Sequence, residues 1–462
     1  MLNLKIAYVS DHNNLKRVAA DISKASVVGI DTETTGLDPL VAKIRLLQIA
    51  TSEAVWVLDC QRLPKQAVLE KVLKPLLPNK KIVKVMQNAK FDIKFLQTYF
   101  GYGLEETEML FDTYLAAKLI AGGQVGAGNN CGLDDLCSRL LNIHLDKSFQ
   151  KFDWAGTLYK EPIAYAGLDA AVLLPLYRLL SKSLSENKLL RVAKLEFDCI
   201  PAIAQLELNG IRLDRDQWLD IAEKGKEEMY QSELILRQYF GDINLGSNPQ
   251  LCKALSSMTG MDIKSVAKGA LEDLVKNYYE KPDLFGRVMD YRLPIMRLQE
   301  YNAVKKMQES FGPDFLKHIH KVTGRIHPEY TQIETNTARQ SCRNPNLQQI
   351  PRDSYMRAAF IAGEGNVMWN SDYSQIELRG MAQFTKDEGY VHAFMNDLDL
   401  HAATAASMFH IPIDKVSGDQ RHAGKTINFG VPYGMGAPRY SVALDIPIEQ
   451  AKKELKAFYD AH

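Results

Sequence analysis

The sequence predicts an α/β domain over residues 1–188 and a longer, mainly helical domain over residues 189–462. Two observations predict this division. In the first domain, short apolar β-prone runs alternate with helix-like stretches, which is the order of elements typical of α/β domains. In the second domain, apolar residues recur with the 3.6-residue period of helices. A length of 462 residues is enough for about two to four domains.

Four strands are predicted in the first domain, and the first three form a meander because only short polar turns separate them. In chain order they are Val27–Ile30, Ile44–Ala50, Ala54–Leu58 and Lys81–Met86. The helices predicted by apolar period are Phe91–Phe100, Glu161–Leu190, Phe197–Leu208, Gln217–Phe240 and Asp283–Phe311. Asn244–Gln250 is rich in turn residues and is predicted to be a loop.

The composition excludes several classes of protein. Hydrophobic residues make up 46% and charged residues 24%, as in soluble globular proteins, and 56 basic residues balance 56 acidic ones. The six cysteines form no C-x-x-C pair, which argues against a zinc or redox site. No apolar stretch approaches the roughly 18 residues of a membrane span, and the N-terminus does not resemble a secretory signal. We therefore predict a cytoplasmic protein that does not bind membranes.

Carboxylates from three segments of the first domain are predicted to converge. Asp31 and Glu33 follow the first predicted strand and point the same way, because residues two apart in an extended chain share a face. Asp92 lies at the start of the next helix, and Tyr165 and Asp169 are one helical turn apart. Carboxylates this close cannot all stay ionised without cations, and they suit a pair of divalent metal ions that activate water for phosphodiester cleavage.

These segments resemble the three motifs of the DEDD proofreading exonucleases, in the subtype with a tyrosine in the third motif. The resemblance covers about residues 1–188 and implies a ribonuclease-H-like fold with 3′→5′ exonuclease activity that uses two Mg²⁺ or Mn²⁺ ions. The residues it implies are Asp31, Glu33 and Asp169 for the first metal ion, Asp31 with Asp92 for the second, and Tyr165 for the attacking water. Asp112 also matches a family motif and is predicted to be structural.

Two cations and two aromatic residues recur at every fourth position in the second domain, as Arg421, Lys425, Phe429 and Tyr433. At 3.6 residues per turn they form one stripe on a helix, with steps of about 6 Å. Arg and Lys are rarely buried unpaired, which argues against a core stripe. Cations that bind phosphates and rings that stack on a base suit a nucleoside triphosphate, and an amphipathic surface helix is the alternative.

Upstream segments favour the triphosphate interpretation. They are Thr337–Arg339, Pro345–Pro351, Ser371–Arg379 and Asp399–His401. Asp372 follows the apolar run Asn366–Trp369, which we predict to be a strand. From about Leu195 onward, these segments and the stripe resemble the motifs of family A DNA polymerases, the bacterial DNA polymerase I type. The resemblance implies a partial right hand of thumb (Leu236–Phe311), part of the palm and fingers, which acts on primer-template DNA, single-stranded 3′ ends and dNTPs.

The polymerase resemblance implies roles for the residues at matching positions. Asp372 would bind both catalytic Mg²⁺ ions, and Glu377 would exclude ribonucleotides by crowding the sugar 2′ position. Lys425 would also protonate the pyrophosphate leaving group. The dNTP-binding residues that it implies are Arg421, Lys425, His401, Phe429 and Tyr433, and the DNA-binding residues are Arg339, Asn346 and Gln349.

Family A polymerases also need a second palm carboxylate in a His-Asp-Glu-like motif, and the 462 residues contain none at a matching position. We therefore expect that this chain does not polymerise DNA unaided. A truncated gene, a second polypeptide that supplies the rest of the palm, and a polymerase remnant that serves the exonuclease all stay open. The functional alternatives are an exonuclease whose polymerase part only binds DNA, and a silent DNA-binding subunit completed by a partner chain.

Two residues depart from the family pattern. Ala338 stands where glycine usually precedes the arginine, so a positive φ at this position would be strained. Pro432 lies one residue before Tyr433 and is predicted to kink or end the helix, because proline has no backbone N–H.

Overall fold

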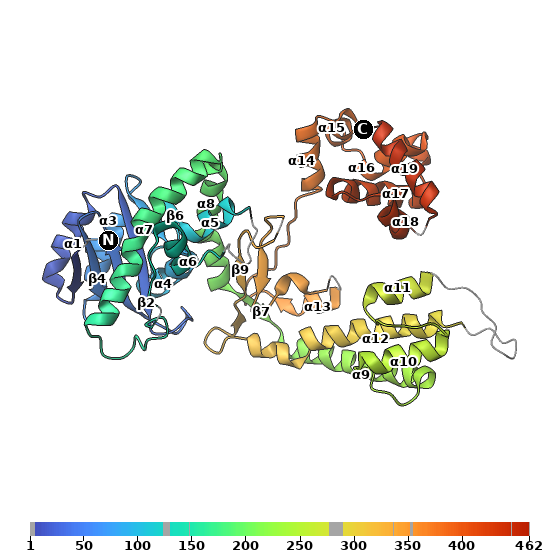
Figure 1. The fold of residues 1–462 in the computed structure, drawn as a ribbon, viewed down its shortest axis with the longest axis horizontal. Helices are drawn as coiled ribbons and strands as arrows, with labels where there is room; N and C mark the ends of the chain where they lie inside the picture. Colours follow the sequence, from blue (N-terminus) through green and yellow to red (C-terminus); the bar gives the residue numbers. More distant parts are fainter. Residues whose placement is uncertain are drawn as a thin grey trace. The chain divides into compact units, whose positions relative to one another are not determined.

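The structure, a computed structural model, describes residues 5–122, 130–146, 148–276, 290–335, 337–351, 354–444 and 446–461. It contains two compact units, Met1–Val367 and Met368–His462, which we describe separately. An α/β part precedes a mainly helical part along the chain (Figure 1), so the predicted fold class is confirmed. The predicted domain boundary at residue 188 stays a prediction.

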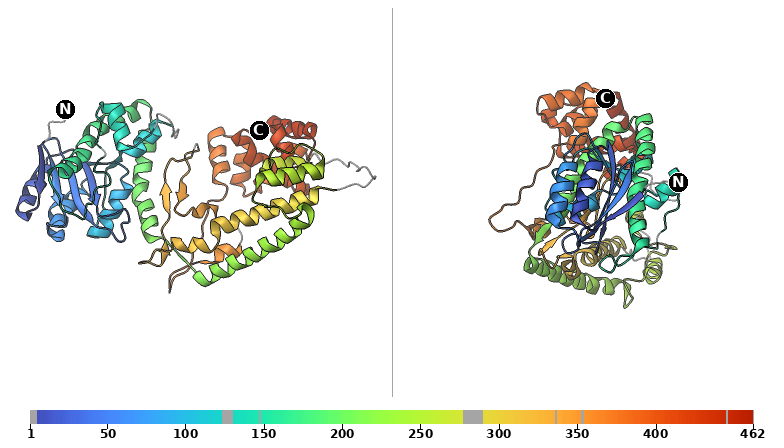
Figure 2. Two further views of the ribbon diagram at one scale, coloured as in Figure 1. Left: turned by 60° about the horizontal axis from the view of Figure 1, so that its bottom comes forward. Right: turned by 90° about the vertical axis from the view of Figure 1, so that its left-hand side faces the viewer.

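The α/β part contains a six-stranded mixed sheet with strand order β1-β4-β3-β2-β5-β6 (Figures 1 and 2). The strands are β1 (Lys5–Val9), β2 (Val27–Thr34), β3 (Ile44–Ala50), β4 (Ala54–Asp59), β5 (Val83–Met86) and β6 (Leu110–Asp112). The predicted meander is confirmed, because β2, β3 and β4 are antiparallel neighbours. The two edge strands, β1 and β6, are not among the predicted strands.

Helices cover both faces of this sheet (Figure 2). They include α1 (Leu15–Ile22), α4 (Lys90–Phe100), α5 (Thr113–Ile120), α7 (Lys160–Glu186) and α8 (Leu190–Asn209). On one face, Leu46 of β3 and Val57 of β4 pack against Ala166 of α7. Val28 and Ile30 alternate to the other face, where α1 and α4 complete the main core.

By length and composition alone, α7 is long and apolar enough to cross a membrane. The expectation that no apolar stretch approaches a membrane span is therefore wrong by this measure. Half of the most apolar window of α7 is buried in the fold, and Ala166 and Ala170 pack on the sheet. Core helices of soluble proteins pass the same test, so α7 alone is weak support for a membrane span.

Long helices dominate the rest of the first unit. They are α9 (Arg215–Phe240), α10 (Asn248–Thr259), α11 (Lys268–Lys276) and α12 (Arg292–Phe311). Leu236 of α9 packs with Ile295 and Leu298 of α12, so these two helices lie side by side (Figure 2). The prediction of a loop over Asn244–Gln250 is wrong in its last three residues, because Pro249 fits the first turn of α10, where its missing N–H is tolerated. The part of the predicted helix before residue 290 lies outside the described residues.

Two small sheets join these helices to the α/β part. The strands β7 (Ile211–Leu213), β8 (Arg325–Ile326) and β11 (Phe360–Ile361) form one sheet, and β9 (Glu329–Thr331) pairs with β10 (Ser341–Arg343). The predicted strand Asn366–Trp369 is wrong: in the described stretch 354–444 it is an irregular segment. Val367 and Trp369 are 86% and 84% exposed, and neither belongs to a sheet within the described residues.

The second unit is helical. It comprises α14 (Ile376–Thr385), α15 (Glu388–Met395), α16 (Leu400–Phe409), α17 (Gly418–Gly430), α18 (Ala437–Leu444) and α19 (Ile448–Ala461). A capping box of Ser417 and Gln420 starts α17. The helix ends at Gly430, and Val431–Tyr433 form a 3₁₀ turn that contains Pro432. The predicted effect of Pro432 on this helix is confirmed.

Ala338 adopts φ = 58°, in the left-handed region that favours glycine. A residue with a Cβ pays about 1–2 kcal/mol for this conformation. We expect Ala338→Gly to raise the free energy of unfolding by up to about 1 kcal/mol, because strain relief exceeds the extra entropy of glycine in the unfolded chain. Urea unfolding would measure this, with Ala254→Gly inside α10 as a control that should lose about 1 kcal/mol. Equal losses in both variants would show that Ala338 is unstrained.

Candidate functional site

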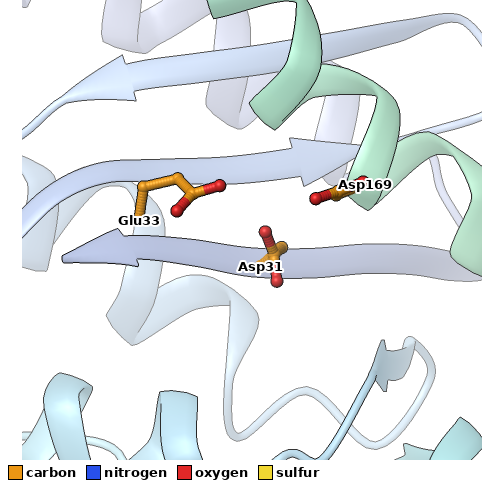
Figure 3. Close-up of side chains that lie close together, drawn as sticks. All are labelled: Asp31, Glu33 and Asp169. Carbon is orange, nitrogen blue, oxygen red and sulfur yellow. The ribbon is translucent and has the colours of Figure 1, made fainter. Parts of the chain in front are cut away.

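Three carboxylates of the α/β part form a compact group (Figure 3). Among the described residues, Asp31, Glu33 and Asp169 each offer a carboxylate oxygen, and these oxygens all lie within 4.8 Å of one another. Asp31 and Glu33 project from β2, and Asp169 projects toward them from α7. Hard oxygen ligands in such a group suit a divalent cation such as Mg²⁺ or Mn²⁺.

The first two carboxylates lie inside a strand. The expectation that Asp31 and Glu33 follow the strand is wrong, because β2 continues to Thr34 while it pairs with β3. Alternation along β2 still places both side chains on the face that α7 covers. Gly29 lets α7 approach this face, since an added Cβ there would lie 2.4 Å from the carbonyl oxygen of Ala170. Nothing in the sequence pattern singles out Gly29 for this role.

Asp92 reaches the site from the side of the sheet that β5 leaves open. β5 pairs with β2 only over Val27–Gly29. Within the described residues, the edge of β2 that faces β5 is therefore unpaired beyond Gly29. Asp92, 2% exposed at the start of α4, accepts a hydrogen bond of 2.6 Å from Thr32 Oγ1. It lies outside the group of three carboxylates. No role is predicted for Thr32 from the sequence. Alternation along β2 places its side chain on the other face of the sheet from Asp31 and Glu33.

Tyr165 lies one helical turn before Asp169 on α7, so the two side chains share a face of this helix. Burial, together with the negative charges of Asp169 and Glu33, raises the pKa of Tyr165. The phenol is therefore neutral at physiological pH, and its hydroxyl can both donate and accept a hydrogen bond.

Asp112 does not join the carboxylate group. Its carboxylate accepts hydrogen bonds from four backbone N–H groups, those of Asn88 (3.2 Å), Ala89 (2.8 Å), Tyr114 (2.8 Å) and Leu115 (3.1 Å). It therefore caps α5 and fixes the turn before α4, which carries Asp92. This arrangement is structural, as predicted for Asp112.

Burial and mutual repulsion make the site carboxyls weak acids. Burial is the largest cause in each case: it raises the pKa of Glu33 to about 9, and those of Asp92 and Asp169 to about 7. Burial and the charges of Asp92 and Glu33 raise the pKa of Asp31 well above its usual range. A bound divalent cation would relieve this repulsion, so the residues present fit a metal site.

Metal affinity is expected to rise steeply between pH 6 and pH 9. Carboxyls with pKa values of about 7 and about 9 carry protons over much of this range, and each must lose its proton before it can bind a cation. Metal binding should therefore release protons. Calorimetric titration with Mn²⁺ in buffers of different ionisation enthalpy would measure both effects. An affinity that is constant across this pH range would show that the carboxyls are already ionised in the metal-free protein.

Two residues of the predicted stripe, Arg421 and Phe429, contact residues at the start of α16. Arg421 forms an ion pair of 2.6 Å with Asp399, which caps α16 by accepting the backbone N–H of His401. The His401 ring, 5% exposed, lies 5.4 Å from the Phe429 ring, measured between centroids. Burial lowers the pKa of His401, so its imidazole is neutral at pH 7. The role of Asp399 is absent from the sequence analysis, although it stands two residues before His401.

Tyr433 and Glu377 are also brought together. The Tyr433 hydroxyl donates a hydrogen bond of 2.7 Å to Glu377 Oε2, which links the turn after α17 to α14. Lys425 is exposed on α17. Asp372 is exposed too and, within the described residues, belongs to no group of three potential metal ligands.

The predicted DNA-binding residues lie in the first unit. Arg339 and Gln349 are exposed. The Asn346 side chain caps a 3₁₀ turn, Leu347–Gln349, by accepting the Gln348 N–H at 3.1 Å. The roles predicted for the residues of the second unit and for these three stay predictions.

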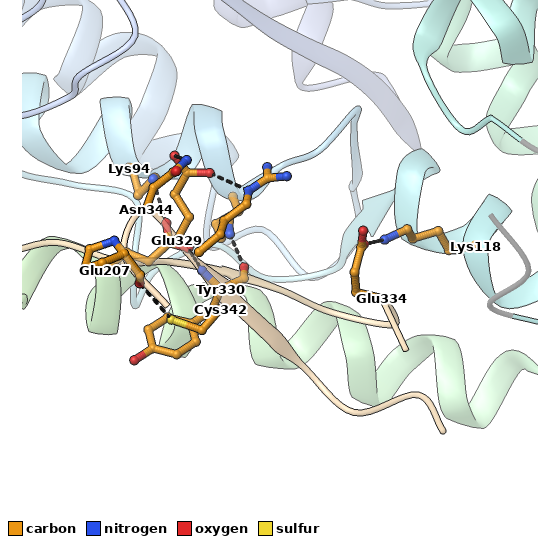
Figure 4. Close-up of polar contacts among 11 residues, drawn as sticks. Lys94, Lys118, Glu207, Glu329, Tyr330, Glu334, Cys342 and Asn344 are labelled. Carbon is orange, nitrogen blue, oxygen red and sulfur yellow. Dashed lines mark hydrogen bonds and ion pairs between the residues drawn. The ribbon is translucent and has the colours of Figure 1, made fainter. Parts of the chain in front are cut away.

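A buried carboxylate joins α4 to the segment around β9 (Figure 4). Glu207 of α8 is 3% exposed, and its two oxygens accept hydrogen bonds from Lys90 Nζ (2.5 Å) and Lys94 Nζ (2.6 Å). Its Oε1 also accepts the backbone N–H of Tyr330 at 2.6 Å. Nearby, buried Lys118 pairs with Glu334. These charges lie beside the helix that carries Asp92.

Comparison with known proteins places this chain in a family. Residues 6–185 match the model for a 3′-5′ exonuclease, and residues 216–462 match that for DNA polymerase family A. DNA polymerase I of Pseudomonas aeruginosa is 32% identical over 96% of this chain and 49% of its own length, and that of Aquifex aeolicus is 28% identical over 98% and 79%. This chain thus spans about half the length of the Pseudomonas relative. The solved polymerase domain of Pol1 from M. smegmatis has the same fold, with a TM-score of 0.78 and 24% identity over 98% of this chain and 76% of its own. The chain belongs to DNA polymerase family A.

Proposed function

We propose that the chain is a DNA polymerase I-type enzyme of replication and repair whose 3′→5′ exonuclease is complete, with residues 1–188 as the exonuclease domain and 189–462 as the polymerase domain. The convergence of Asp31, Glu33 and Asp169 carries the proposal. Carboxylates on neighbouring elements, with a phenol one turn away, suit the hydrolysis of a phosphodiester at a DNA 3′ end. We place the protein in the cytoplasm.

In this proposal each residue of the α/β site has a task. Two Mg²⁺ or Mn²⁺ ions, held by Asp31, Glu33 and Asp169 with Asp92 assisting, would supply a nucleophilic water at neutral pH and stabilise the leaving oxygen. The neutral Tyr165 hydroxyl, one turn from Asp169 on α7, would orient the attacking water.

The second unit would bind the incoming dNTP. Arg421 and Lys425 supply cations for the phosphates, and the rings of Phe429 and Tyr433 supply stacking surfaces for the base. The hydrogen bond between Tyr433 and Glu377 holds the carboxylate that would crowd a ribose 2′-hydroxyl. The M. smegmatis structure is a complex with primer-template DNA and dNTP, and we extend both ligands to this chain.

Polymerisation by these 462 residues alone is not part of the proposal. Asp372 is exposed and, in the described parts of the chain, belongs to no group of three potential metal ligands. A two-metal site with one carboxylate is incomplete, so synthesis would need an acid from a further segment, such as a second polypeptide.

A 5′-labelled primer on a longer template, in Mg²⁺ with and without dNTPs, tests the proposal. We expect the primer to shorten in both conditions and Asp31→Ala to abolish the shortening. Extension with dNTPs would show that another residue supplies the second carboxylate. A primer that stays intact while the protein binds it would contradict the exonuclease and favour a silent DNA-binding subunit.

A further inference from the structure

Gln48 is a buried polar side chain without a hydrogen-bond partner. It is 0% exposed, and neither its Oε1 nor its Nε2 has a partner within the described residues. An unpaired buried amide destabilises the fold, and native proteins contain few of them. A leucine or methionine of similar volume would avoid this cost. The amide therefore needs an explanation beyond packing.

The strand register places Gln48 directly opposite Asp31. The two residues are paired between β3 and β2, so their side chains share a face, with Cβ atoms about 4.5–5.5 Å apart. On the other side of β3 the paired residue is Val57, which offers no side-chain partner. Leu46 and Ala50, two positions away on the same face, pack against α7. Gln48 thus lies on the same sheet face as Asp31, which α7, the helix that carries Asp169, covers.

We propose that Gln48 is a positioning residue of this site: when Asp31 binds a divalent cation, Gln48 Nε2 donates a hydrogen bond to the Asp31 carboxylate and fixes its orientation. An ionised carboxylate offers about four lone-pair sites, so Asp31 can bind a cation and accept this bond together. The amide spans three bonds beyond Cβ, which is long enough to reach a carboxylate on the paired residue. This inference rests on the proposed metal-dependent exonuclease.

Mn²⁺ binding to the full chain, measured by calorimetry, tests the inference in Gln48→Met and Gln48→Leu. Both variants keep the side-chain volume and remove the amide. Ile49→Leu is the matched control, because Ile49 is the next residue of β3, is equally buried, and faces the other side of the sheet. The Mn²⁺ binding that Asp31→Ala abolishes is the binding that we assign to this site. Thermal unfolding of the metal-free proteins separates metal binding from stability.

We expect both Gln48 variants to bind Mn²⁺ about 10–100-fold more weakly at the Asp31-dependent site, the usual effect of losing a partner of a metal ligand. Their metal-free unfolding temperature should equal or exceed that of the wild type, and Ile49→Leu should keep the wild-type affinity. Wild-type affinity in the Gln48 variants would overturn this inference and leave the proposed function intact. Variants that fail to fold would overturn it too, because the amide would then be needed by the metal-free fold. Wild-type binding that Asp31→Ala leaves unchanged would overturn the proposed function as well.

Discussion

Asp31→Asn is expected to slow the removal of 3′ nucleotides by about 10³-fold or more, and to stabilise the metal-free protein. The amide cannot bind a cation as a carboxylate does, and Asp31 is the residue shared by both proposed metal positions. The pKa of Asp31 is raised in the fold, so its proton is held more tightly there than in the unfolded chain. Its contribution to stability is therefore lost as the pH rises above about 4 toward the folded pKa. Asparagine removes this penalty, which predicts a higher free energy of unfolding than that of the wild type at pH 8.

Asp112→Asn is the matched control for Asp31→Asn. It makes the same chemical change at a buried aspartate of the α/β part, but Asp112 accepts four backbone hydrogen bonds instead of facing the site. Burial raises the pKa of Asp112 to about 6, so asparagine relieves a charge penalty here as well. We nevertheless expect a loss of about 1–3 kcal/mol, because the amide NH2 group cannot accept a hydrogen bond and leaves at least one of the four backbone N–H groups without an acceptor. Degradation of a 5′-labelled single strand and urea unfolding give both quantities. If Asp31→Asn lost stability and Asp112→Asn gained it, the roles assigned to the two residues would be reversed.

Glu207→Leu is expected to lower the free energy of unfolding by about 3–5 kcal/mol, the usual cost of leaving buried charges without a partner. The substitution removes the carboxylate that pairs with Lys90 and Lys94, whose side chains are only 17% and 15% exposed. It also removes the acceptor of the Tyr330 N–H. Chemical denaturation of the full chain measures the loss.

Asp198→Leu, on the same helix α8, controls for Glu207→Leu. Its ion pair with Lys194 is exposed, with side-chain exposures of 59% and 73%, and exposed pairs contribute little to stability. We expect little change in this variant. Similar losses in both variants would mean that the substitution of leucine into α8, rather than the buried charges, causes the destabilisation.

The sequence predicts the elements whose apolar pattern is local. β3 begins and ends as predicted, at Ile44 and Ala50, because a run of apolar residues between polar turns is enough to define a buried strand. Asn366–Trp369 shows the same kind of run but forms no strand, because a strand also needs a hydrogen-bonding neighbour. Thr34 belongs to β2 only through its pairing with β3. Such pairing depends on residues far away in the sequence.

In the candidate site too, local spacing is predicted from the sequence, whereas contacts between separate elements are not. Spacing alone places Asp31 and Glu33 on one face, and the structure brings the predicted third carboxylate, Asp169, beside them. The contacts that support the group join separate elements: Thr32 with Asp92, and Gly29 with α7. A single sequence carries no signal for such contacts beyond the alternation of a strand.

The direction of digestion distinguishes a 3′→5′ exonuclease from other nucleases. A single-stranded oligonucleotide with different labels at its two ends, incubated with the chain and Mg²⁺, reports which end is removed first. We expect the 3′ label to be released at once as a mononucleotide, while the 5′ label remains on a strand that shortens by one nucleotide at a time. Asp31→Asn should stop both the release and the shortening. Early release of the 5′ label, internal cleavage, or an undiminished rate in Asp31→Asn would contradict this expectation.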